Sequence, residues 1–202
     1  MTTRAVSRRS ALRRIGAGAG ALTLLPFLSE DGLAAFVKIQ AAGAAPAPKV
    51  LSPAQYATVE ALVEAIIPAD ERSPGAKEAR VADYVDLLLS EAAEDSVRQT
   101  WLDGLAALDA EAGQRFGAPF VRLETAQVEA LLTDLSRNET AERKTPLEAF
   151  FTTTKQATIH GYYTSEIGIH KELRYKGNQL LAEFTGCLTQ DGKVCPHCGQ
   201  KA

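Results

Sequence analysis

The amino-acid sequence predicts a mainly α protein: a small irregular bundle of about five to six helices, with a disordered N-terminal leader and a loop-like C-terminal tail. Two stretches have the form of a capping box with proline at the first helical position, namely Ser52-Pro53-Ala54-Gln55 and Thr145-Pro146-Leu147-Glu148. Apolar residues recur at the three- and four-residue spacing of a buried helical face. No turn dipeptide lies between two alternating apolar runs, so a sheet is not predicted.

Residues 1–45 have the layout of an export leader followed by a linker. Five arginines precede an uncharged run from Ile15 to Leu28. As a helix, this run would rise only about 21 Å, which is less than the roughly 30 Å hydrocarbon core of a bilayer. A permanent membrane anchor is therefore the weaker interpretation.

The arginine cluster is more specific than a general leader. Arg8 and Arg9, followed by Leu12 and then a further basic residue, resemble the twin-arginine export motif, although Ala11 stands where that motif usually has Phe. That pathway carries folded proteins. The alternative is an ordinary secretory leader with incidental arginines. Candidate cleavage sequences of small-x-small form are Ala42-Gly43-Ala44 and Ala45-Pro46-Ala47, and an earlier cut would fall near Ala34 or Ala35.

Residues 50–187 form the predicted domain. Its first helix follows the N-cap Ser52 and ends at Pro68, and a turn-rich stretch occupies residues 68–76. A second helix surrounds residues 81–89, and the later helices span about 95–112, 126–137 and 145–161. The residues expected to face inward are Tyr56, Val59, Val63, Ile66, Ile67, Val81, Tyr84, Val85, Leu88, Leu89, Val97, Trp101, Leu105, Leu108, Val128, Leu131, Leu132, Leu135, Phe150 and Phe151.

The charge of the chain argues against nucleic acid as a partner. The formal net charge is −3, but residues 1–45 carry six basic and two acidic groups, so the rest has 16 basic against 23 acidic groups, a net charge of −7. An acidic domain has no excess of Lys or Arg to displace the counterions of a phosphate backbone.

No catalytic motif stands out in the domain. The sequence lacks HExxH, a P-loop, GxSxG and a complete Rossmann fingerprint. Its acidic clusters, Asp83 with Asp86 and Glu91 with Glu94 and Asp95, are interpreted as solvated helix faces and ends. No catalytic residue and no directly bound cofactor is assigned.

The chemistry-bearing residues gather in the tail, residues 188–202, and just before it. Cys187, Cys195 and Cys198 are candidates for a disulfide, and the same cysteines with His197 are candidates for a metal site. Haem attachment needs CxxCH, but Gly199 follows the CxxC. A thiol–disulfide redox pair needs a thioredoxin-type context, which this sequence does not supply. A disulfide, a metal site, redox chemistry and an unpaired or partner-linked thiol remain as alternatives.

Several segments together resemble the gluconate 2-dehydrogenase subunit 3 family, over roughly residues 50–187. The matching segments are Ala65-Ile66-Ile67-Pro68-Ala69-Asp70, Ser73-Pro74-Gly75-Ala76, Val81 to Asp86, Gly104 to Asp109, Thr158-Ile159-His160-Gly161-Tyr162-Tyr163, and Tyr175-Lys176-Gly177-Asn178 through to Cys187. The resemblance makes Pro68, Asp70, Pro74, Gly75, Tyr162, Tyr163, Tyr175 and Gly177 family-motif residues and candidates for docking a partner.

The resemblance implies a non-catalytic small subunit of an FAD-dependent sugar or sugar-acid dehydrogenase. In that family the small subunit carries the twin-arginine leader, a GMC-type flavoprotein holds the FAD, and a cytochrome c subunit with haem c accepts the electrons. The expected role is co-export through the twin-arginine translocase, maturation and stabilisation of the flavoprotein, in the periplasm or at the outer face of the cytoplasmic membrane. The alternative is a stand-alone exported redox or metal-binding protein that acts through the Cys195-Pro196-His197-Cys198 motif.

Overall fold

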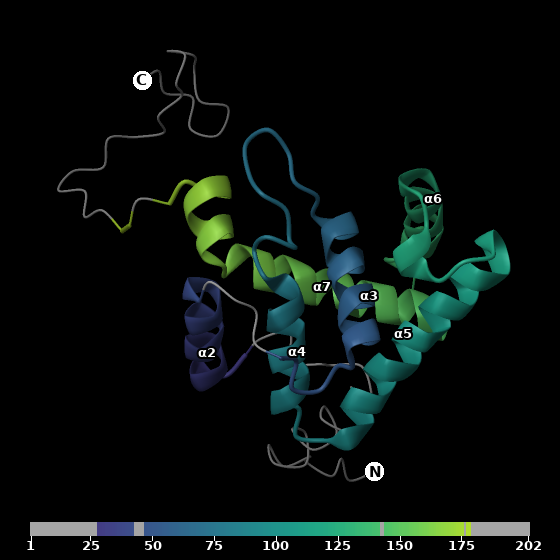
Figure 1. Ribbon diagram of the computed structural model, residues 1–202, viewed down its shortest axis with the longest axis horizontal. Coiled ribbons are helices and arrows are strands. Elements are labelled where there is room, and N and C mark those ends of the chain that lie inside the picture. Colours follow the sequence, from purple (N-terminus) through teal and green to yellow (C-terminus); the bar gives the residue numbers. More distant parts are fainter. Residues whose placement is uncertain (1–27, 43–46, 142–143, 176, 179–202) are drawn as a thin grey trace, which may run out of the picture.

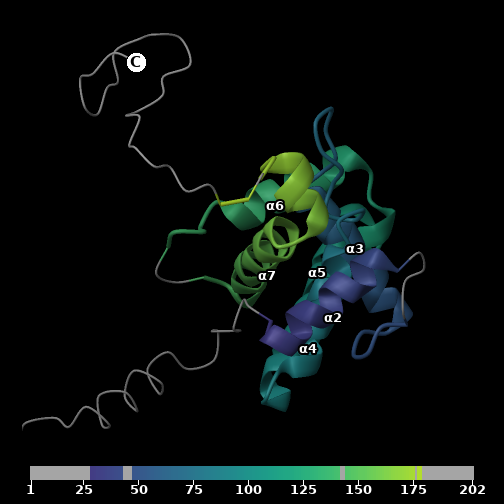
Figure 2. The same ribbon diagram turned by 90° about the vertical axis from the view of Figure 1, so that its left-hand side faces the viewer.

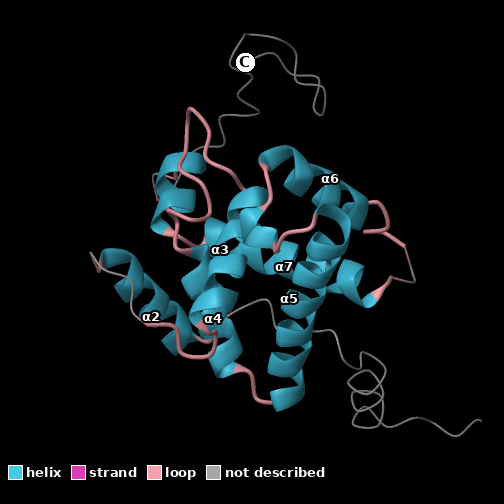
Figure 3. Cartoon of the chain, turned by 45° about the vertical axis from the view of Figure 1, so that its right-hand side comes forward, coloured by secondary structure: helices cyan, strands magenta, loops and turns pink. Residues whose placement is uncertain are grey.

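The computed structural model describes residues 28–42, 47–141, 144–175, 177 and 178, and in these residues it is helical, with no strand. The mainly α prediction is confirmed (Figures 1 and 3). The elements are α2 (Glu30–Ala41), α3 (Pro53–Ile66), α4 (Val81–Glu91), α5 (Asp95–Phe116), the 3₁₀ turn η1 (Phe120–Arg122), α6 (Thr125–Ser136), α7 (Pro146–Tyr163) and the π-helical turn η2 (Gly168–Glu172). Among the described residues, no helix is both long and apolar enough to cross a membrane.

Helix α7 is the centre of the bundle. It contacts α3, α4, α5 and α6, while α2 lies at one side of the molecule against α4 (Figures 1 and 2). Where α7 meets α5, the Trp101 and Phe150 rings pack edge to face with their centroids 5.5 Å apart. Gly104 makes this approach possible, because a Cβ there would overlap the Phe150 ring. The core is thus organised around α7, the last long helix among the described residues.

Both predicted capping boxes are confirmed, and they fix where α3 and α7 begin. The Ser52 hydroxyl accepts a hydrogen bond from the Gln55 amide, and the Gln55 side chain accepts one from the Ser52 amide. Thr145 and Glu148 make the same reciprocal pair at 3.2 and 2.6 Å. Each box satisfies amide groups that the first turn of a helix otherwise leaves without partners.

Helix α2 was not predicted, because its residues were assigned to the leader and linker up to residue 45. It packs on α4 through Phe36, whose side chain is fully buried and whose ring lies edge to face on Tyr84, at a centroid distance of 5.3 Å. Phe36, Tyr84 and Leu87 form a second, smaller apolar cluster beside the main core. The expectation of an unstructured segment is therefore wrong for residues 30–41.

Two helix ends also differ from the sequence expectation. Helix α5 continues past Gly113 to Phe116 and stops at Gly117, whose φ of 76° is the left-handed conformation that terminates helices. Helix α7 continues two residues beyond Gly161, to Tyr163. A single helical glycine without φ > 0, such as Gly113, lowers helix stability but does not end the helix.

Candidate functional site

The loop between α3 and α4 holds a fixed shape although its tip, residues 68–72, is exposed. Asp70 organises the tip: its carboxylate accepts hydrogen bonds from the amides of Arg72 (2.7 Å) and Ser73 (2.9 Å), and its own amide donates to the Ser73 carbonyl (3.0 Å). These amide donors hold the pKa of Asp70 below its usual value of 3.8. The loop closes where the Ala76 amide donates to the Ile67 carbonyl at 2.9 Å.

Glu64, near the end of α3, holds the base of this loop. Its carboxylate accepts hydrogen bonds from the amides of Ala69 (3.2 Å) and Lys77 (2.7 Å), one on each side of the turn. Gly75 lies directly against this carboxylate, and a Cβ at position 75 would overlap it and come within 2.6 Å of the Ala69 nitrogen. The glycine of the Ser73-Pro74-Gly75-Ala76 segment is therefore required by close approach.

Tyr162 joins the loop to the end of α7. Its hydroxyl donates to the Pro74 carbonyl at 2.8 Å and lies 2.7 Å from the Ser73 hydroxyl, and both side chains are buried. Burial raises the pKa of Tyr162, while the hydrogen bond from Ser73 opposes that shift. Tyr162 is therefore protonated at neutral pH and available as a donor to Pro74.

Exposed apolar side chains lie beside this junction. Tyr163, Leu173 and Tyr175 are 39%, 57% and 49% exposed. The loop and η2, which precedes Leu173, lie at the same end of the molecule in both orientations (Figures 1 and 2). We call this region the tyrosine end: residues 68–76 together with Tyr162, Tyr163, Leu173 and Tyr175.

A π-helical turn sets the direction in which the chain leaves the tyrosine end. The amide of Leu173 donates to the Gly168 carbonyl, and the amide of Tyr175 donates to the Ile169 carbonyl, each at 3.0 Å. A side chain at Gly168 would overlap the Tyr162 carbonyl, so this turn packs directly on the last turn of α7. The exposed apolar residues are thus held on a structured segment. Exposed apolar groups gathered at one place mark interaction surfaces more often than scattered ones.

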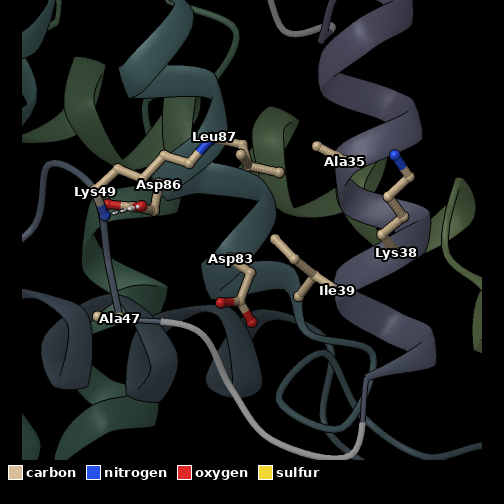
Figure 4. Close-up of a pocket in the computed structure, with 8 residues that line it drawn as sticks. All are labelled: Ala35, Lys38, Ile39, Ala47, Lys49, Asp83, Asp86 and Leu87. Atoms are coloured by element: carbon tan, nitrogen blue, oxygen red, sulfur yellow. Dashed lines mark hydrogen bonds between the residues drawn. The ribbon is translucent and has the colours of Figure 1, made fainter.

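Asp83 and Asp86 are buried, so their interpretation as a solvated helix face is wrong. Asp86, which is 4% exposed, accepts hydrogen bonds from three consecutive amides, those of Lys49 (2.6 Å), Val50 (3.0 Å) and Leu51 (2.9 Å). It thereby fixes the segment that leads into α3 (Figure 4). Glu91, Glu94 and Asp95, by contrast, are exposed as expected.

Asp83 has a different set of partners. It forms an ion pair with Arg80, whose Nε lies 2.7 Å from the carboxylate. Burial and the charge of Asp83 raise the pKa of Tyr56. Both aspartates line a cavity of about 230 Å³ between α2 and α4 (Figure 4). Their oxygens bind groups of the chain itself, so the cavity has a structural explanation.

The structure brings together most of the motif residues proposed for docking. Pro68, Asp70, Pro74 and Gly75 form the loop, and Tyr162, Tyr163 and Tyr175 complete the same end. Gly177 follows Tyr175, is exposed, and has a φ of 91°. The sequence does not identify Ser73 and Glu64 as residues that stabilise the loop of the tyrosine end. No local sequence pattern shows that Ser73 contacts Tyr162, which lies 89 positions later.

The other predicted functional residues lie outside the part of the chain that the structure describes. These are the export-motif residues Arg8, Arg9 and Leu12, and the disulfide and metal candidates Cys187, Cys195, His197 and Cys198. Within the described residues, no group of three or more His, Cys, Asp or Glu side chains is placed to hold a metal ion.

Comparison with known proteins gives one family. The family model described as gluconate 2-dehydrogenase subunit 3 matches residues 53–179, more than half of the 202-residue chain. Comparisons with curated proteins and with solved structures give no match. The matched range begins at the first residue of α3 and contains the whole tyrosine end.

Proposed function

This chain belongs to the gluconate 2-dehydrogenase subunit 3 family, and on that premise we propose that it is the small accessory subunit of a dehydrogenase complex. The catalytic subunit would be an FAD-dependent, GMC-type flavoprotein that oxidises a sugar or sugar acid. FAD would be bound by that partner, and a cytochrome c subunit would carry haem c. This chain would contribute binding, export and stabilisation, with no catalytic group of its own.

The observation that carries the proposal is the tyrosine end. Two motif segments far apart in sequence, at residues 73–76 and 161–163, meet there through the hydrogen bonds of Tyr162. The junction holds an exposed loop beside three exposed apolar side chains. A surface that is both preorganised and apolar loses little conformational entropy on binding, which favours a stable complex. We infer that the flavoprotein binds here.

The proposed role in export rests on the arginine pair. Arg8 and Arg9 would direct the folded complex to the twin-arginine translocase, and the complex would function in the periplasm or at the outer face of the cytoplasmic membrane. A flavoprotein without a leader of its own would then cross the membrane bound to this subunit.

Co-expression with a GMC-type flavoprotein tests both parts. We expect the flavoprotein to co-purify with the wild-type chain and to reach the periplasm. In the double variant Arg8→Lys, Arg9→Lys, we expect the complex to form but to stay in the cytoplasm.

Leu173→Glu tests the binding surface. It should weaken co-purification at least tenfold, because a buried interface charge without a partner is costly. Val121→Glu is the matched control: Val121 is 44% exposed on η1, is not one of the residues of the tyrosine end, and should leave binding unchanged. An exported, active flavoprotein in cells that lack this chain would refute the proposal.

A further inference from the structure

Helix α2 is tied to the domain at both of its ends. At its start, the Glu91 carboxylate of α4 accepts hydrogen bonds from the amide of Ser29 (2.9 Å) and from its hydroxyl (2.6 Å). Near its end, the Gln40 side chain donates to the Ala79 carbonyl (3.2 Å) and accepts from the Glu166 amide (3.3 Å). Helix α2 therefore runs antiparallel to α4 and also reaches the segment that follows α7.

The contact at Ser29 is electrostatically favourable for both helices. The Ser29 hydroxyl caps α2 by accepting a hydrogen bond from the Gly32 amide at 3.0 Å. Glu91 places a negative charge at this helix N-terminus, where the helix dipole favours an anion. At the C-terminus of α4, its own helix, the same charge is unfavourable, so the approach of α2 offsets that cost. Gly32 permits the approach, since a Cβ there would overlap the Glu91 carboxylate.

Burial gives α2 a second hold on the domain. Phe36 is fully buried against Tyr84 and Leu87, which are 1% and 3% exposed. Without α2, Tyr84 and Leu87 would lose their cover and present apolar surface on α4. Burying an aromatic side chain of this size contributes about 1.5–3 kcal/mol to the free energy of folding. Helix α2 therefore stabilises the domain as a helix of the core does.

The position of α2 bears on how the chain is processed after export. The small-x-small sequences at residues 42–47 follow α2, and a cut near Ala34 or Ala35 falls within it. Hydrolysis at either place adds one water across a peptide bond and leaves a leader fragment that contains Ser29. A cut at residues 42–47 would separate the whole of α2 from the domain on which it packs, and a cut near Ala34 or Ala35 would separate its first half.

We propose that α2 remains part of the mature chain, so that any removal of the leader by a leader peptidase takes place before Ser29. The proposal rests on the export suggested above, because a chain that folds before it crosses the membrane meets the peptidase with α2 already docked. The small-x-small sequences at residues 42–47 are then not cleavage sites.

Intact-mass measurement of the full chain, isolated from the periplasm with its partner, tests the proposal directly. We expect a first residue at or before Ser29, and this includes an uncut chain. A first residue at Ala35, or anywhere from Gly43 to Pro48, would overturn it. A chain found only in the cytoplasm would count against the proposed export instead, and the second measurement below still decides the role of α2.

The second measurement uses the full chain with an inserted recognition sequence for a specific protease. In one version the sequence stands between Ala44 and Ala45, and in the matched control it stands between Pro26 and Phe27. After digestion and gel filtration, the first version should lose α2 and unfold about 5 °C or more below its undigested form. The control should keep its midpoint within about 1 °C. Equal midpoints for the two digested proteins, with mass spectrometry showing that α2 is absent from the first, would refute the assignment of α2 to the domain.

Discussion

The phenolic oxygen of Tyr162 lies 2.7 Å from the hydroxyl oxygen of Ser73, although 89 positions separate the two residues in the chain. The same phenol donates to the Pro74 carbonyl. Both partners belong to the loop between α3 and α4, so one side chain at the end of α7 joins this loop to the last helix.

Tyr162→Phe should therefore loosen the loop more than it destabilises the protein as a whole. The change removes the phenolic hydroxyl that the buried Ser73 hydroxyl and the Pro74 carbonyl both contact, which costs about 1–2 kcal/mol. Urea unfolding measures that loss, and hydrogen exchange should show faster exchange at the Arg72 and Ser73 amides. Ser73→Ala, which keeps the bond to Pro74, should have the smaller effect. Unchanged exchange in Tyr162→Phe would mean that Asp70 and Glu64 fix the loop without Tyr162.

Two glycines in α5 give opposite predictions for the same substitution. Gly104→Ala places a Cβ into the Phe150 ring and should destabilise the protein by about 1–3 kcal/mol, because the α5–α7 contact must open. At Gly113 a Cβ would meet nothing within 4 Å. Gly113→Ala should therefore stabilise the protein by about 0.5–1 kcal/mol, the usual gain of alanine over glycine inside a helix. Thermal unfolding of both variants measures these changes as shifts of the midpoint. Two midpoint shifts of the same sign would contradict the packing of Gly104 against Phe150.

Asp86→Ala tests the role of the buried carboxylate. The three amides of residues 49–51 would lose their acceptor, and we expect a loss of about 2–4 kcal/mol in the free energy of unfolding. Glu78→Ala, at an exposed position on the segment just before α4, is the control and should change stability by less than about 0.5 kcal/mol. A small effect in both variants would show that water replaces the carboxylate at no cost.

Acid should destabilise the protein through carboxylates whose pKa is lowered in the folded state. The amide of Thr145 and the side chain of Asn138 hold the pKa of Glu148 below its usual value of 4.5, and the Asp70 carboxylate is likewise below 3.8. A lowered pKa contributes stability above the unfolded-state value, and that contribution disappears as the pH falls through the folded-state value. The thermal midpoint should thus fall from about pH 5 downward.

Asp70→Asn and Glu148→Gln separate titration from hydrogen bonding. Each amide keeps an oxygen that accepts the backbone hydrogen bonds but removes the group that titrates. Both variants should show a flatter dependence of the midpoint on pH between about 5 and 2 than the wild type, and at neutral pH they should lack the part of the stability that the ionised carboxylate contributes. A wild-type slope in the double variant would assign the acid sensitivity to other carboxylates, such as Asp134 beside Arg115.

The sequence predicted the helices that carry local signals. Ser52 and Thr145 start α3 and α7 because capping is decided within four residues, and the inward stripe of α4 follows from its spacing. The sequence does not predict helix α2, because residues 30–41 are rich in alanine and follow an apolar run, which is typical of the end of a leader. Its place in the fold depends on Phe36 meeting Tyr84, a contact that no local pattern shows.

The site was harder to predict than the fold for the same reason. The motif residues could be named from the sequence, but their union at one end depends on the Tyr162–Ser73 pair. Asp86 looked like a surface carboxylate because its three donors lie 35 to 37 positions earlier in the chain. Burial of a charged group by distant backbone amides leaves no periodic signature.

The central place of α7 has a consequence for the newly made chain. Helices α3 to α6 leave the ribosome first, yet each of them packs on a helix that is synthesised after them. Until residue 163 has emerged, the apolar surfaces that these helices turn toward α7 lack their partner and are open to aggregation or to capture by chaperones. The domain therefore completes its core only after α7 has been synthesised, and the helices made before it are exposed for the longest time.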